Sequence, residues 1–90
     1  PELGNLTNLT GLYLDDNQLS GNIPPELGSL THLTRLYLNG NLLSGPISDN
    51  LRNLTGLTQF YYPATVCVPN TPEFLAWISI ITHSHDLLCQ

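Results

Sequence analysis

The chain has 90 residues, of which 41% are hydrophobic and 10% are charged. This composition excludes a disordered tail, and the length leaves room for one modest core and excludes most multi-step enzymes. The net charge is -5, lysine is absent, and the only basic side chains are Arg35 and Arg52, which excludes a surface that follows nucleic-acid phosphates and a polybasic membrane anchor.

The sequence repeats itself with a period of 24 residues. Most coincidences are leucines, and the matched pairs include Leu6 and Leu30, Leu9 and Leu33, Leu12 and Leu36, Leu14 and Leu38, Asn17 and Asn41, and Ile23 and Ile47. Residues 12–14 and 36–38 alternate apolar with polar side chains, which predicts short strands. Such short strands are stable only if the next repeat supplies a parallel neighbour.

The remainder of each repeat predicts a turn and a helical return. Asn17 and Asn41 can bond the turn backbone of their own and the adjacent coil, and Ser-Gly at 20–21 and 44–45 provides a bend. Leu27, Leu30 and Leu33 are spaced by three, as in a short 3₁₀-like return on the opposite face.

The pattern from Leu6 to Gly28, with its Leu-Ser-Gly-x-Ile-Pro segment, resembles a leucine-rich repeat of the plant type. The resemblance covers residues 1–62 and implies an α/β solenoid with short parallel strands on its concave face. Ser48 and Arg52 replace the proline and glycine of the second repeat, and Thr65 stands where the third repeat should have asparagine. Residues 1–62 are expected to be the C-terminal part of a longer solenoid.

Residues 63–90 are expected to form a C-terminal cap with a helix over about 71–82. Asn70 or Thr71 can cap this helix, and an apolar stripe follows at helical spacing, made of Phe74, Trp77, Ile78 and Ile81. Cys67 and Cys89 are the only cysteines, which favours a disulfide in an oxidising compartment. In the chain-entropy view, closing the loop of residues 67–89 contributes roughly 3 kcal/mol.

Outward-pointing side chains of the strands are the candidate ligand-binding residues. They are Tyr13, Asp15, Asp16, Arg35, Tyr37, Asn39, Gln59 and Tyr61. The tyrosines should form a ladder across the sheet, with Asp15 and Asp16 as an acidic edge next to Arg35. The resemblance implies that such faces bind proteins, peptides or glycans, whereas the alternative is that tyrosine is simply a good strand former. We expect no catalysis, because no nucleophile or third catalytic group accompanies the aspartates.

Three Asn-Leu-Thr sequons make Asn5, Asn8 and Asn53 glycosylation candidates, although this tripeptide also arises from the repeat pattern itself. Cys67, His83, His85 and Cys89 could in principle bind zinc, but their spacing is unlike common zinc modules. We therefore expect no metal and no cofactor, and residues 83–86 are expected to form a solvated loop.

The sequence thus predicts a non-enzymatic, extracellular interaction module that is secreted or belongs to the ectodomain of a membrane-anchored parent. Its expected partner is a protein, peptide or glycan, with no nucleic acid and no membrane contact by this segment. The alternative is a purely structural segment that caps a longer solenoid and touches no ligand.

Overall fold

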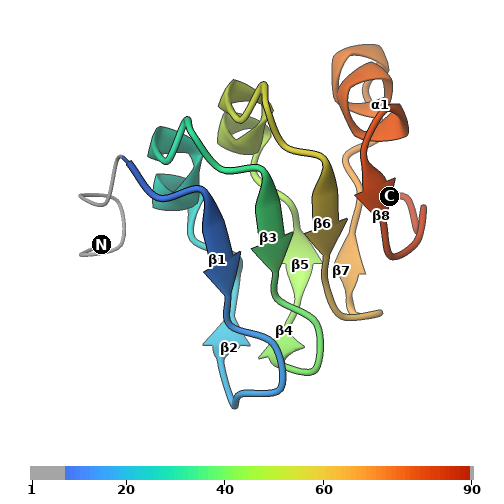
Figure 1. The fold of residues 1–90 in the computed structure, drawn as a ribbon. Helices are drawn as coiled ribbons and strands as arrows, with labels where there is room; N and C mark the ends of the chain where they lie inside the picture. The colour runs from blue at the N-terminus through green and yellow to red at the C-terminus, as the bar shows by residue number, and fades with distance from the viewer. Residues whose placement is uncertain (1–7, 90) are drawn as a thin grey trace.

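The computed structural model describes residues 8–89, which wind into coils stacked side by side (Figure 1). Each coil contributes one short strand to a shared sheet, formed by β1 (Gly11–Tyr13), β3 (Arg35–Tyr37), β6 (Gln59–Tyr61) and β8 (Thr82–His83). The strands are parallel and follow the order β1-β3-β6-β8. We call this the concave sheet. It confirms the solenoid of short parallel strands that the repeat predicts.

The other side of each coil holds two-residue strands and a helical return. The small sheets pair β2 (Ser20–Gly21) with β4 (Leu42–Leu43), and β5 (Gly45–Pro46) with β7 (Val66–Cys67). The returns are η2 (Pro25–Ser29), η3 (Asp49–Asn53) and α1 (Pro72–Ser79). They lie next to one another at one end of the strands, with η3 in contact with both η2 and α1 (Figure 1).

The core is a leucine stack built by the period of the repeat. Leu12, Leu36 and Phe60 lie opposite one another in the sheet register and are all buried. The return leucines are buried as well: Leu27, Leu30, Leu33, Leu51, Leu54 and Leu57. Each buried leucine stabilises the fold by about 1.5–3 kcal/mol relative to exposure. Within the described residues no polar or charged side chain belongs to this core.

The departures of the second repeat have structural reasons. A Cβ atom on Gly28 would lie 2.4 Å from the backbone oxygen of Asn50 in the next return, so no larger residue fits there. Arg52 occupies the equivalent position in η3, and the next return after η3 is the helix α1 instead of a 3₁₀ return. Its guanidinium bonds both carboxylate oxygens of Asp49, at 2.7 and 2.8 Å. Ser48, in place of proline, accepts a hydrogen bond from the Asn50 N–H at 3.3 Å.

The backbone continues to coil beyond residue 62, where the repeat pattern ends. After β6 the chain forms β7, then α1 in place of a 3₁₀ return, and then β8, which pairs with β6. The boundary between residues 62 and 63 is therefore a change of sequence pattern, while the third coil runs across it.

Helix α1 starts as expected and ends earlier than expected. The Thr71 hydroxyl caps it by accepting a hydrogen bond from the Phe74 N–H at 3.3 Å, and Pro72 occupies its first turn. It ends at Ser79 because Ile80 and Ile81 lead directly into β8. Phe74 and Ile78 are buried, and the Trp77 indole donates to the Leu54 carbonyl at 3.4 Å.

The expectation of a solvated loop over residues 83–86 is wrong for its first residue. His83 belongs to β8 and pairs with Phe60, the inward-facing position of the sheet. A strand of two residues has no detectable period, so the sequence gives no sign of it. Beyond it the chain turns back, Leu88 pairs with Val68, and a disulfide joins Cys67 to Cys89 with a Cα–Cα distance of 5.0 Å.

Candidate functional site

The concave sheet carries a continuous row of aromatic rings. Tyr13, Tyr37 and Tyr61 lie opposite one another in the register of β1, β3 and β6, and we call them the tyrosine row. Neighbouring ring centroids are 4.9 and 5.0 Å apart with interplanar angles of 84° and 78°. These are edge-to-face contacts, the arrangement that aromatic quadrupoles favour. The sequence-predicted ladder is thus present, with perpendicular instead of stacked rings.

The rings of this row differ in how they are held. Tyr13 is 54% exposed, and its ring lies over Gly11, where a Cβ atom would come within 2.9 Å of the ring. Tyr37 is half-buried, and its hydroxyl donates to the Gln59 side-chain oxygen. The row is therefore held in place at its centre and offers its largest free surface at Tyr13.

The acidic residues lie at the end of β1, in the turn that follows it. Asp16 adopts a left-handed conformation with φ of 58°, and its N–H donates to the Asn39 carbonyl at 3.0 Å. Asp15 is half-buried and Arg35 is exposed. Within residues 8–89 no ion pair joins Arg35 to either aspartate, so the acidic edge and the single cation of this face stay separate charges.

Asn39, one of the candidate ligand-binding residues, adds a buried polar atom to this face. Its side-chain oxygen is buried and has no hydrogen-bond partner among the described residues. Buried acceptors of this kind are uncommon, because losing water without a replacement bond costs about 1–3 kcal/mol.

The side chains of Asn17 and Asn41 hold the turns behind this face by hydrogen bonds to the backbone. The Asn41 amide donates to the Leu38 carbonyl at 3.0 Å and to the Leu14 carbonyl of the preceding coil at 2.8 Å. Its oxygen accepts from the Leu19 N–H at 3.1 Å. Asn17 bonds the Leu14 carbonyl of its own coil at 2.9 Å. Thr65, which replaces the third asparagine, donates its hydroxyl proton to the Leu43 carbonyl of the preceding coil.

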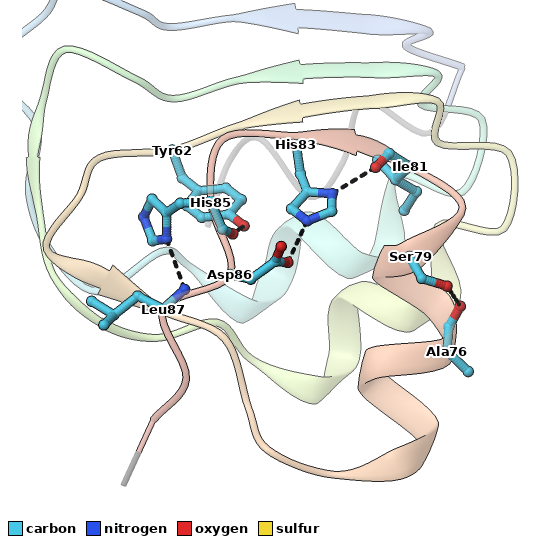
Figure 2. A network of polar contacts seen from close by, with 8 residues as sticks. All are labelled: Tyr62, Ala76, Ser79, Ile81, His83, His85, Asp86 and Leu87. Atoms are coloured by element: carbon cyan, nitrogen blue, oxygen red, sulfur yellow. Dashed lines mark hydrogen bonds and ion pairs between the residues drawn. The ribbon is translucent and has the colours of Figure 1, made fainter.

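A second polar cluster closes the C-terminal end (Figure 2). The His83 ring places Nδ1 2.6 Å from the Ile81 carbonyl and Nε2 2.6 Å from an Asp86 carboxylate oxygen. Burial disfavours the charged ring, but these two hydrogen bonds and the Asp86 charge outweigh burial and raise the pKa of His83.

Tyr62 and His85 complete this cluster. Tyr62 occupies the position of Leu14 and Leu38 in the repeat, and its hydroxyl donates to the His85 carbonyl at 2.5 Å. Burial raises the pKa of Tyr62 to about 12, so it is neutral at physiological pH. His85 accepts from the Leu87 N–H at 3.1 Å through Nδ1 and lies 3.1 Å from the Pro63 carbonyl through Nε2. Sequence reasoning considered His83 and His85 only for zinc and missed these contacts, although a tyrosine at a core position signals a buried hydroxyl that needs a partner.

The remaining candidate positions are those of the zinc alternative and of the glycosylation sequons. Both cysteines of the zinc alternative are joined to each other. Residues 8–89 contain no group of three or more His, Cys, Asp or Glu side chains placed to hold a metal. Asn8 and Asn53 are exposed, and Asn5 lies outside the described residues.

Comparisons with known proteins agree with this architecture. A family model described as leucine rich repeats (2 copies) matches residues 7–53. No curated protein sequence matches the chain. None of the helices between residues 8 and 89 has the length and apolar character needed to cross a membrane.

Two solved structures resemble the chain closely. The plant peptide hormone receptor RGFR1 in complex with RGF2 is 35% identical, with a TM-score of 0.73, over 91% of this chain and 14% of that chain. The crystal structure of PEPR1–AtPEP1 is 33% identical, with a TM-score of 0.75, over 97% of this chain and 12% of that chain. The 90 residues thus span a small fraction of the length of either protein.

Proposed function

The chain belongs to the leucine-rich repeat family, and from this premise we propose that it is a non-enzymatic interaction module that binds a peptide or protein ligand through its concave sheet. The names of both similar structures give a second component, RGF2 in one and AtPEP1 in the other, and the first protein is described as a plant peptide hormone receptor. The binding residues of this proposal are the tyrosine row together with Asp15, Asp16, Arg35, Asn39 and Gln59.

The observation that carries the proposal is the exposed aromatic surface of the tyrosine row. Large aromatic side chains supply most of the energy of protein interfaces, because they bury much area with few rotatable bonds. Here the three rings pack edge to face, and Tyr13, whose ring lies over Gly11, is 54% exposed. A ligand lying across β1, β3 and β6 would meet a surface that is already ordered, which lowers the entropic cost of binding.

The size of the face limits what these residues can hold. Three short strands offer a few hundred Å², below the ~800 Å² per partner of a standard interface. The ligand that we propose is therefore an extended peptide or one edge of a larger partner.

The proposal also includes an extracellular location, which the disulfide supports, and glycosylation at the exposed Asn8 and Asn53.

A second candidate function is favoured by the C-terminal end. The disulfide, α1 and the polar cluster around Tyr62 close the last coil, which suits a structural segment that seals a solenoid without touching a ligand.

Selection from a library of random linear peptides distinguishes the two candidates. The selected peptide is measured against the wild-type chain, Tyr13→Ala and the control Leu42→Ala, which truncates an exposed apolar side chain on the small β2–β4 sheet. Tyr13→Ala should weaken binding by about 2 kcal/mol, a roughly 30-fold rise in Kd, because it removes an anchor. Leu42→Ala should leave the Kd unchanged. A library without binders would support the structural role instead. A peptide whose affinity does not depend on Tyr13 would contradict binding through the tyrosine row.

A further inference from the structure

The last residues of the described chain are folded back onto the third coil, and we call residues 84–89 the C-terminal clasp. Besides its disulfide, the clasp is held by hydrogen bonds to Tyr62 and Val68. Tyr62 donates its N–H to the Ser84 hydroxyl at 2.9 Å and its own hydroxyl to the His85 carbonyl. Val68 exchanges two backbone hydrogen bonds with the clasp, from its N–H to the Leu87 carbonyl at 2.6 Å and from the Cys89 N–H to its carbonyl at 2.8 Å.

One contact ties the turn of the clasp to β8, and it involves a titratable ring (Figure 2). Both nitrogens of His83 lie 2.6 Å from an oxygen, one from the Ile81 carbonyl and the other from Asp86. A carbonyl and a carboxylate can only accept hydrogen bonds, and a neutral imidazole carries only one N–H. The geometry therefore fits the imidazolium, which donates to both oxygens. In the neutral ring, one nitrogen lone pair would face an oxygen lone pair.

We propose that the C-terminal clasp is a pH-dependent closure in which protonated His83 holds Asp86, and in which loss of that proton loosens the clasp. The two states differ in one charged contact and in the pairing of Leu88 with Val68. Opening would uncover the backbone of Val68, directly after β7, and an unpaired extended backbone is a template for pairing with another strand. Because the disulfide retains Cys89, the opening is local and reversible.

The surroundings of His83 leave Asp86 as its one charged partner among the described residues. On the neighbouring strand it pairs with Phe60, and Tyr62 of the same polar cluster has a hydroxyl that is neutral at physiological pH. The acidic residue of α1, Glu73, lies in its first turn and acts on Arg52. The disulfide does not titrate.

His85 is the second titratable ring of the clasp, and its hydrogen bonds favour the opposite protonation state. Its Nδ1 accepts from the Leu87 N–H, so an added proton there would break that contact. Control by His83 predicts a clasp that loosens as the pH rises, whereas control by His85 predicts a clasp that loosens as the pH falls.

The sign of the linkage follows from the raised pKa of His83. Closure is fully favoured below the pKa of the open state, about 6.5 for an ordinary histidine, and the advantage is lost as the pH rises through the higher pKa of the closed state. Each unit between these two values corresponds to about a tenfold change in the closing equilibrium.

Amide hydrogen exchange combined with NMR titration of the histidine rings tests this closure in the 90-residue oxidised chain. The protection factors of the Val68 and Cys89 amides, corrected for intrinsic exchange rates, should fall as the pH rises through the pKa of His83. Their acid-to-base ratio should equal ten raised to the measured pKa difference between wild type and Asp86→Asn. The Leu38 amide, bonded to the Tyr61 carbonyl at 2.8 Å in the centre of the sheet, should keep its protection.

Asp86→Asn is the decisive variant because Asp86 is exposed and its loss leaves the core intact. In this variant the pH dependence of Val68 and Cys89 protection should vanish, while the matched remote change Asp16→Asn should leave it as in the wild type. Protection that does not change with pH in the wild type would overturn the proposal. A dependence that survives Asp86→Asn would also overturn it, because the contact of His83 with Asp86 would then not control the clasp. So would a dependence that runs toward loosening in acid, which would assign control to His85.

Discussion

At the scale of single residues, the turn after each concave strand is the most constrained place in the chain. Asp16 and Gly40 occupy equivalent turn positions, and both have positive φ, 58° and 72°. A Cβ atom on Gly40 would also lie 2.3 Å from the Asp16 carboxylate and 2.9 Å from its backbone nitrogen. Close stacking of coils therefore adds a steric demand to the conformational one, and glycine satisfies both.

Three glycine-to-alanine variants separate these demands. Gly40→Ala meets the steric and the conformational penalty and should lower the free energy of unfolding by roughly 3 kcal/mol. Gly21→Ala has a φ of 85° with open space around it and should cost about 1 kcal/mol. Gly56→Ala, with its nearest neighbour at 3.9 Å, should stay within about 0.5 kcal/mol of the wild type. Urea unfolding measures all three, and equal losses for Gly40→Ala and Gly21→Ala would refute the close approach to Asp16.

At the scale of elements, α1 replaces a 3₁₀ return and is the one regular helix in the described part of the chain. Its first turn depends on the Thr71 hydroxyl, and its buried face rests on η3 and on the core through Phe74 and Ile78. A helix of eight residues is too short to be stable alone, so packing and capping decide whether it forms.

Thr71→Ala should therefore destabilise the chain by about 1 kcal/mol, because it removes the side-chain acceptor for the Phe74 N–H. Thr71→Ser keeps the acceptor and serves as the matched control, with an expected change of a few tenths of a kcal/mol. Thermal unfolding followed by circular dichroism measures both. If serine and alanine destabilise the chain equally, the hydroxyl is not acting as a cap.

The elements also show what could be predicted from the sequence. The 24-residue period places β1, β3 and β6 in register and puts the tyrosines in one row, because identical repeats must stack with identical neighbours. The same logic fails after Tyr62, where no leucine pattern remains. β8, the pairing of Leu88 with Val68 and the contacts of His85 depend on tertiary packing of unique residues. The left-handed conformation of Asp16 could not be predicted from its own repeat either, because glycine stands at the equivalent position only in the next repeat, as Gly40.

At the scale of the whole molecule, the described coils differ in how they are closed. The first two share an apolar hollow lined by Leu14, Leu19, Leu27, Leu38 and Leu43 among others, and Leu19 is 39% exposed. The last coil is closed by α1, the clasp and the disulfide. Stability in such a solenoid is a sum of neighbouring coil contacts, so a covalent link at the closed end restrains the last coils most.

Reduction of the disulfide should lower the free energy of unfolding by roughly 3 kcal/mol, through the restored freedom of the loop of residues 67–89 in the unfolded chain. Comparison of urea unfolding for the oxidised chain and the Cys67→Ser, Cys89→Ser double variant measures the loss. The intact mass of the unreduced chain should show the absence of two hydrogens and no reaction with an alkylating agent. Alkylation of both cysteines in the native protein would contradict the bond and remove the support for an oxidising compartment.

The central claim is that the concave sheet is the binding face, and it is tested most directly by NMR titration of the isotope-labelled chain with a library-selected peptide. The claim predicts that amide shifts concentrate on β1, β3 and β6, around the tyrosine row, and that η2, η3 and α1 stay unchanged. Shifts centred on the helical returns or on the clasp would contradict it and would place the binding face elsewhere on the solenoid.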